Sequence, residues 1–204
     1  MYSPNVIYHV YNQSINFEPL FRSEENYLFF LNKIRTHLLP VADILCYCLM
    51  PDHFHLMLKP KPDGCAPSNV RRLPKAGESP GEVHYQQELS HQIKIMLSSY
   101  TRAFNKRYNR RGSLFKGKTK AKPGYQDFVA EHHEFSVEAP FTRYVPYLRT
   151  CFYYIHENPV KAHYALSPEE WPFSSAADYA NLREGTLCNY ALAEHLLGIT
   201  RKPF

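Results

Sequence analysis

The sequence has no long apolar run and little that marks a membrane or secreted protein. No window approaches the about 18 consecutive apolar residues of a membrane-spanning helix. The first residues, MYSPNVIYHVYNQ, have neither the basic start nor the apolar stretch of a signal peptide. The five cysteines are odd in number and irregularly spaced, which argues against a disulfide framework and against a zinc pattern. We therefore expect a cytoplasmic protein with no membrane partner.

The composition is typical of a folded domain. Of the 204 residues, 44% are hydrophobic and 15% are aromatic, which is too rich in Tyr and Phe for a disordered chain. A chain of this length can form one domain around a single core. We expect that domain to span residues 1–180, with irregular loop insertions near 60–86 and 123–143, and to be followed by a tail, 181–204, with a short helix.

Basic residues gather in one segment of the chain. Residues 106–122, KRYNRRGSLFKGKTKAK, contain eight of the 24 lysines and arginines and none of the 19 acidic residues, so acids outnumber bases elsewhere. Such a local excess indicates a polyanionic partner such as nucleic acid, although a solvated basic loop is the alternative. The aromatic residues within the segment favour nucleic acid. The side chains that we expect to contact DNA are Arg110, Arg111, Lys116, Lys118 and Lys120.

Hydrophobic periodicity predicts alternating strands and helices. Strands are expected at 5–13, 42–50, 53–58 and within 113–121, and helices at 23–39, 89–104 and 146–158. In the first helix, the expected buried stripe is Leu28, Leu31, Ile34 and Leu38. The order of these elements is the split βαβ of ferredoxin-like domains. We therefore predict an α+β fold, with an antiparallel sheet, helices on one face and a further C-terminal helix.

The stretch LMPDHFHLML, residues 49–58, places two histidines one residue apart in an apolar run. Residues i and i+2 of a strand face the same way, so His53 and His55 project together while Phe54 faces the other side. Two neutral imidazoles can share a bound cation. Two surface histidines without a ligand fit the spacing equally well, because a metal site needs at least one further ligand.

The helix expected at 146–158 offers candidates for that ligand. Tyr147, Tyr154 and Asn158 lie at i, i+7 and i+11, on one face of it. Asn158 would supply an amide oxygen and Tyr154 a phenol. Tyr153 with His156 is a rival pair on a neighbouring face, and the spacing does not choose between the two pairs.

Four stretches resemble, in the same order, the single-tyrosine transposases of the HUH superfamily (His, hydrophobic, His), especially the REP-associated tyrosine transposases. The stretches are YHVYNQSIN, YCLMPDHFHLMLKP, LSSYTRAFNKRYNRRGSLFKGK and YIHENPVKAHYALSPEEWPFSS. The combination of MPDHFH with YIHENPVKA is the specific part of the resemblance. The sequence departs from the family in its two long insertions and in SLFKGKTKA, where strings containing glutamine are common.

The resemblance implies that residues 1–180 are a catalytic domain in which His53, His55 and Asn158 bind a divalent metal, Mg²⁺ or Mn²⁺, and Tyr154 is the nucleophile. It implies cleavage and rejoining of single-stranded or hairpin DNA by transesterification, through a 5′-phosphotyrosine intermediate. A DNA-hairpin-binding protein without turnover and a relaxase-like nickase are the alternatives. The chain would act as a monomer or a homodimer. His9, in the first expected strand, is expected either near this site or in a structural role.

Overall fold

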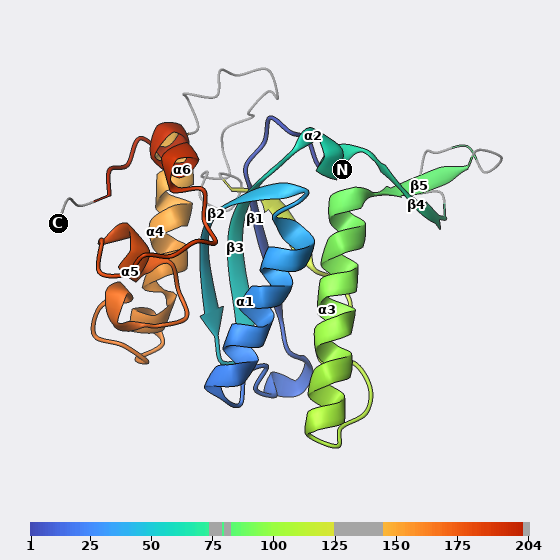
Figure 1. The fold of residues 1–204 in the computed structure, drawn as a ribbon, viewed down its shortest axis with the longest axis horizontal. Coiled ribbons are helices and arrows are strands. Elements are labelled where there is room, and N and C mark those ends of the chain that lie inside the picture. The colour runs from blue at the N-terminus through green and yellow to red at the C-terminus, as the bar shows by residue number, and fades with distance from the viewer. Residues whose placement is uncertain (74–78, 80–82, 125–144, 202–204) are drawn as a thin grey trace, which may run out of the picture.

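An antiparallel sheet of four strands forms the centre of the molecule (Figure 1). The structure is a computed structural model, and it describes residues 1–73, 79, 83–124 and 145–201. The strands lie in the order β2-β3-β1-β6, and every neighbouring pair is antiparallel. Their bounds are β1 Tyr8–Gln13, β2 Ala42–Met50, β3 His53–Pro60 and β6 Lys120–Pro123.

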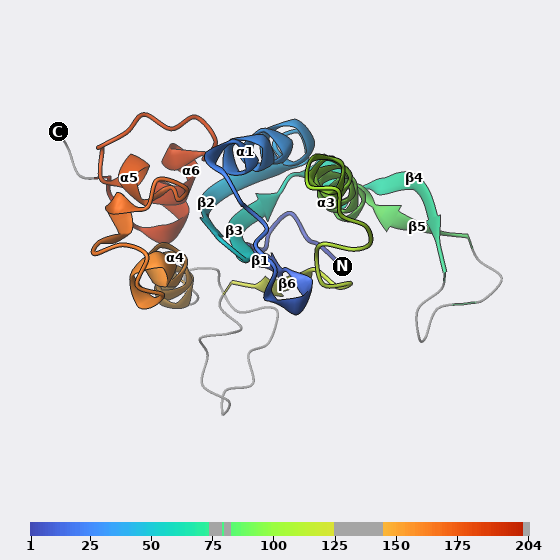
Figure 2. The same ribbon diagram turned by 90° about the horizontal axis from the view of Figure 1, so that it is seen from below.

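Helices cover the two faces of the sheet unequally. Helices α1 (Glu24–Leu38) and α3 (Glu88–Arg107) lie side by side on one face, whereas α4 (Val145–Lys161) lies on the other, towards β2 (Figure 2). The chain order β1, α1, β2, β3, α3, β6 with antiparallel neighbours is the split βαβ arrangement. The predicted α+β fold is therefore confirmed. Within the described ranges, no helix combines the length and the apolarity needed to cross a membrane.

Shorter elements connect and extend this framework. Helix α2 follows β3, and helices α5 and α6 follow α4. Two 3-10 turns, η1 and η3, precede α1 and α5. The bounds are η1 Ile15–Phe17, α2 Pro62–Cys65, η3 Pro168–Glu170, α5 Ala176–Tyr179 and α6 Tyr190–Leu197. Helix α6 begins at a true cap, because the side chain of Asn189 accepts a hydrogen bond from the backbone of Leu192.

The sequence prediction for α1 misplaces part of its buried face. Ile34 is buried as expected, but Leu28 is 54% exposed, while Tyr27 and Phe30 face the core. Residues 27–31, YLFFL, are all apolar, so their pattern does not fix the phase of the helix. The contacts with α3 and the sheet decide it instead.

The insertion expected as a loop at 60–86 contains a β-hairpin. Strands β4 (Pro67–Arg72) and β5 (His84–Gln87) pair antiparallel. This hairpin, called the arm below, projects beyond α3 on the side away from α4 (Figures 1 and 2). The second expected insertion lies outside the described residues from position 125 onwards.

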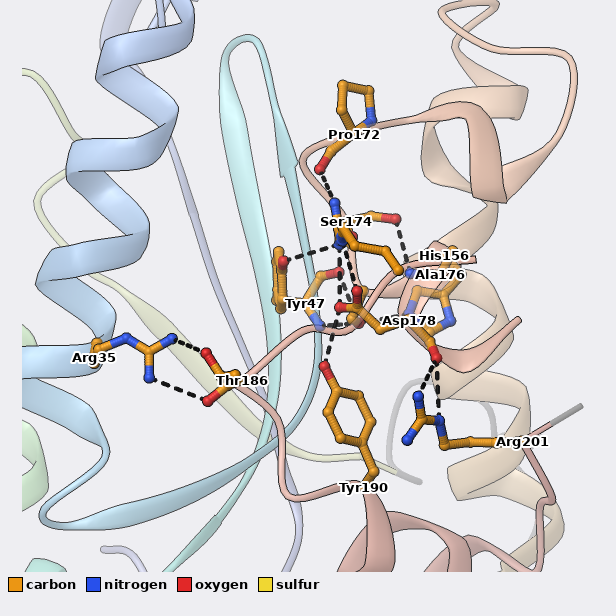
Figure 3. A network of polar contacts seen from close by, with 12 residues as sticks. Arg35, Tyr47, His156, Pro172, Ser174, Ala176, Asp178, Thr186, Tyr190 and Arg201 are labelled. Carbon is orange, nitrogen blue, oxygen red and sulfur yellow. Dashed lines mark hydrogen bonds and ion pairs between the residues drawn. The ribbon is translucent and has the colours of Figure 1, made fainter. Parts of the chain in front are cut away.

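A buried polar network fastens the segment after α4 to β2 (Figure 3). The fully buried carboxylate of Asp178 forms an ion pair with Arg183, at 2.6 Å, and accepts a hydrogen bond from the Tyr190 hydroxyl, at 3.0 Å. Arg183 also donates to the carbonyl oxygens of Pro172 and Ser174. Because buried charges require partners, this network fixes the position of the C-terminal segment against the sheet.

Candidate active site

The face of the sheet opposite α1 and α3 carries a group of polar rings. On β3, Phe54 packs into the core between the sheet and these helices, so His53 and His55 project to the opposite face. On β1, His9 and Tyr11 project to that same face, since Tyr11 is the register partner of His55. We call these four side chains the ring cluster: His9, Tyr11, His53 and His55.

The members of the ring cluster contact one another directly. The His9 ring stacks on Tyr11 with a centroid separation of 4.6 Å and on His55 with a separation of 5.0 Å. The His53 and His55 rings meet edge to face, also with centroids 5.0 Å apart. The two histidines of the HFH stretch are therefore neighbours within one packed group of rings.

Hydrogen bonds orient the two imidazoles of β3. His55 Nδ1 lies 2.8 Å from His9 Nε2, and His53 Nδ1 lies 2.7 Å from the carboxylate of Asp52. Each imidazole is thus held through Nδ1, which leaves Nε2 as the atom that can face a ligand. Metal-bound histidines are held in this way by second partners.

The electrostatic surroundings keep His55 neutral. Burial, reinforced by the neighbouring His9 and His53, lowers the pKa of His55 well below its usual value. The uncharged ring is the form that binds a cation. The site therefore favours a neutral imidazole at neutral pH.

Helix α4 brings Tyr154 to the ring cluster. The Tyr154 ring lies edge-on to His55, with a centroid separation of 5.8 Å, and to His9, with a separation of 6.1 Å. The Lys161 ammonium lies 5.3 Å from the centre of the Tyr154 ring and pairs with Glu157, at 2.8 Å. A phenol, two imidazoles and an ammonium group thus meet on this face of the sheet.

The rival pair, Tyr153 and His156, lies elsewhere. Tyr153 is 48% exposed and packs on Phe152. His156 is buried, and its Nε2 lies 2.8 Å from the hydroxyl of Ser175. Burial lowers the pKa of His156 to about 3. Ser175 is fully buried as well, so this Ser–His pair is a packed internal contact and not an accessible nucleophile.

Asn158 sits one turn after Tyr154 on α4. The end at residue 158 expected for this helix is wrong, because α4 continues through Pro159 to Lys161. Proline has no N–H to donate to the carbonyl of Ile155. The amide nitrogen of Asn158 donates to the carbonyl of Tyr154, at 2.8 Å, and reaches that of Ile155, at 3.5 Å. These bonds leave the Asn158 amide oxygen as the free acceptor, though the described residues show no contact between Asn158 and either histidine of β3.

The donor types at this site suit a divalent metal. Two imidazole nitrogens and an amide oxygen would leave coordination positions for water or phosphate oxygens, as Mg²⁺ or Mn²⁺ requires. Among the described residues, no group of three or more His, Cys, Asp or Glu side chains could hold a metal ion. A metal here would therefore depend on Asn158 as the third ligand.

The five basic residues expected to contact DNA are placed differently from one another. Arg110 pairs with Glu18 through two nitrogens, at 2.6 and 2.9 Å, and its guanidinium also donates to the carbonyl of Ser113. This residue therefore anchors its own loop. The other four are exposed, and Lys120 among them reaches the ring cluster, where its ammonium lies near the Tyr11 ring. These four residues are Arg111, Lys116, Lys118 and Lys120.

Three residues near the site, Tyr11, Lys122 and Lys161, have no role in the sequence prediction. Tyr11 stacks on His55 in the ring cluster. The ammonium of Lys120 lies 5.5 Å from the centre of the Tyr11 ring. Lys161 follows Tyr154 at i+7, and Lys122 lies opposite His9 in the register of β1 and β6. The i, i+2 spacing of His9 and Tyr11 could have indicated Tyr11, and helical spacing could have indicated Lys161.

Comparison with known proteins adds one finding. No family model and no curated protein matches the sequence. A solved structure described as a REP-associated tyrosine transposase bound to a REP hairpin is similar to this chain, with a TM-score of 0.49 and 13% sequence identity. The match covers 94% of this chain and 92% of that chain.

Proposed function

We propose that this protein is a metal-dependent DNA transposase that cleaves and rejoins single-stranded, hairpin-containing DNA through Tyr154. The observation that carries the proposal is the position of Tyr154, edge-on to His55 and His9 on the polar face of the sheet. A phenol is a known covalent nucleophile, and neighbouring imidazoles could hold a metal that activates the phosphate it attacks. The resemblance of MPDHFH and YIHENPVKA to HUH transposases supports the same chemistry.

The reaction is a transesterification. The Tyr154 oxygen forms a bond to the scissile phosphorus while the bond from phosphorus to the 3′ oxygen breaks. The Tyr154 hydroxyl loses its proton as it attacks, the departing 3′ oxygen takes up one proton, and the 5′ end remains on the enzyme as a phosphotyrosine. Attack by a 3′-hydroxyl reverses the step and rejoins DNA, so no nucleotide energy source is consumed.

The chain supplies stabilisation around the attacking oxygen. A tyrosine hydroxyl ionises only near pH ~10, so it is a weak nucleophile at neutral pH. Lys161, which also pairs with Glu157, lies 5.3 Å from the centre of the Tyr154 ring, so its charge is close enough to favour negative charge on the phenol during attack. A divalent metal bound by His53, His55 and Asn158 would neutralise the non-bridging phosphate oxygens and orient the phosphate.

The test is a covalent-adduct assay with adjacent tyrosines as matched variants. Wild-type protein is incubated with single-stranded hairpin DNA and Mn²⁺, then resolved by denaturing electrophoresis. Tyr154→Phe is expected to abolish the protein–DNA band, whereas Tyr153→Phe is expected to retain it. Both replacements remove one hydroxyl, but Tyr154 is the less exposed, so unchanged circular dichroism and hairpin binding by Tyr154→Phe are required to exclude a folding defect.

Other outcomes would contradict the proposal in different ways. Loss of the adduct in Tyr153→Phe alone would move the nucleophile to the other face of α4. Tight hairpin binding by the wild type without any adduct would favour a binding protein without turnover. Cleavage without rejoining when a 3′-hydroxyl strand is supplied would favour a relaxase-like nickase.

A further inference from the structure

Two adjoining grooves run along the β6 edge of the sheet, between that edge, the arm and α3. The first has a volume of about 840 Å³ and the second of about 820 Å³. Both are lined by Lys94 of α3 and by Lys118, which precedes β6. The two hollows therefore share a wall, and together we call them the edge channel.

The charge of the edge channel has one sign. The lining of the first groove includes six basic residues, and that of the second adds two more, while neither lining includes Asp or Glu. The six are Arg71, Arg72, Lys94, Lys118, Lys120 and Lys122, and the further two are Arg102 and Lys116. A concave surface lined by charges of one sign concentrates the opposite charge, in this case that of a polyanion.

The edge channel differs from the basic segment that is visible in the sequence. Four of its basic residues come from the arm and α3, outside residues 106–122. Within that segment, Arg107 pairs with Glu25 and Arg110 with Glu18, so these two arginines serve the fold. In the folded protein, two arginines of the segment therefore stabilise the fold. Other basic residues of the segment line the channel together with residues of the arm and of α3.

Lysines on an edge strand also prevent unwanted strand pairing. That role explains Lys120 and Lys122 on β6, but it does not explain cations that face the edge from other elements. Arg71 on the arm and Lys94 on α3 are exposed, and neither side chain forms a hydrogen bond or ion pair within the described residues. Their charges are available to a ligand.

The edge channel meets the ring cluster at one residue. Lys120 lines the first groove, and its ammonium lies 5.5 Å from the centre of the Tyr11 ring. Tyr11 in turn stacks on His9 and His55. Lys120 therefore connects the channel, around the β6 edge, to the polar face of the sheet.

The lining also offers a surface for base stacking. Tyr85 of the arm is 43% exposed and lines the first groove. Exposed aromatic rings beside a basic groove bind the bases of single strands, whereas the bases of a duplex are already stacked on one another. This feature favours single-stranded nucleic acid over other polyanions.

We infer that the edge channel binds the backbone of single-stranded DNA, with Arg71 and Lys94 contacting phosphates and Tyr85 stacking on a base. This inference rests on the proposed function for the choice of DNA and for the strand's path to Tyr154. The binding itself is independent of cleavage. The arm thereby becomes part of the substrate-binding surface.

The experiment measures binding of a fluorescent single-stranded oligonucleotide by anisotropy, in chelator so that no metal-dependent cleavage occurs. The Arg71→Ser/Lys94→Ser double variant is compared with Lys33→Ser/Lys106→Ser, which removes the same charge from positions outside the channel lining. The first is expected to weaken binding about 10-fold near 0.1 M salt and to reduce the log–log salt slope by about 1.4. The second is expected to change affinity by less than about 2-fold. Equal losses in the two double variants would overturn the inference.

A second variant identifies the ligand class. Tyr85→Ala is expected to weaken single-strand binding at least about 5-fold without changing the salt slope. It should leave binding of heparin, a polyanion without bases, unchanged. Loss of heparin binding, or a duplex that binds as tightly as the single strand, would show that the channel does not select single-stranded DNA. Failure of the Tyr154→Phe test with these binding results intact would refute the chemistry and not the channel.

Discussion

Alternate side chains of strand β3 lie on opposite faces of the sheet. Phe54, Leu56 and Leu58 are fully buried beneath α1 and α3, whereas His53 and His55 join the ring cluster. Two helices close the first face, while α4 covers the second towards β2 (Figure 2). The comparison shows that one set of residues packs into the apolar core while the other joins a group of polar rings on the opposite face.

The largest effect on stability is expected from opening the apolar face. Phe54 packs between Phe30 and Phe115, with ring centroids 5.3 and 6.0 Å away. Phe54→Ala should lower the free energy of unfolding by about 3–5 kcal/mol, because it leaves a cavity in a closed core. Urea denaturation followed by circular dichroism measures the loss. A loss below about 1 kcal/mol would mean that this face is not the main source of stability.

A smaller effect is expected from adding metal to the polar face. Under the proposed function, Mn²⁺ at ten times its dissociation constant should raise the free energy of unfolding by about 1.4 kcal/mol, since only the folded chain would bring the proposed ligands together. The gain should disappear in His53→Ala/His55→Ala and persist in Tyr153→Phe. Thermal denaturation with and without Mn²⁺ measures it, without reference to DNA cleavage. A gain of the same size in the double histidine variant would place the metal elsewhere.

The smallest effect on stability is expected from His53 alone. Its side chain is 28% exposed and bonds to Asp52, which is itself partly exposed. His53→Ala should therefore change the free energy of unfolding by less than about 0.5 kcal/mol. The same variant should form no covalent DNA adduct under the proposed function. A variant that unfolds readily, or one that retains full adduct formation, would contradict the division between the two faces.

Much of the framework could be predicted because its patterns are local. The apolar and polar alternation of HFHLML places His53 and His55 on one face, and the stripe from Leu89 to Phe104 defines α3. The choice between Tyr153 and Tyr154 could not be made locally. It depends on which side of α4 meets the sheet, and both tyrosines fit an amphipathic helix.

The edge channel escaped prediction because its parts are distant in the sequence. The arm comes from a stretch rich in Pro and Gly that lacks strand-like alternation. The pairing of Arg110 with Glu18 joins residues 92 positions apart, so the sequence alone did not separate this arginine from its exposed neighbours. Residue type indicated a nucleic-acid surface, but only tertiary contacts show which cations line it.

The pairing of β1 with β6 has a consequence for protein synthesis. Tyr11 pairs with Lys120, and His9 lies beside Tyr154, so the polar face joins an early strand to residues more than ~100 positions later in the chain. Contacts between such distant residues form late, because closing a long loop costs chain entropy. A nascent chain that has not reached position 154 carries the histidines without the tyrosine. Under the proposed function, a polypeptide that ends before Tyr154 cannot cut DNA, so the linear order of the residues delays activity until that tyrosine has been added.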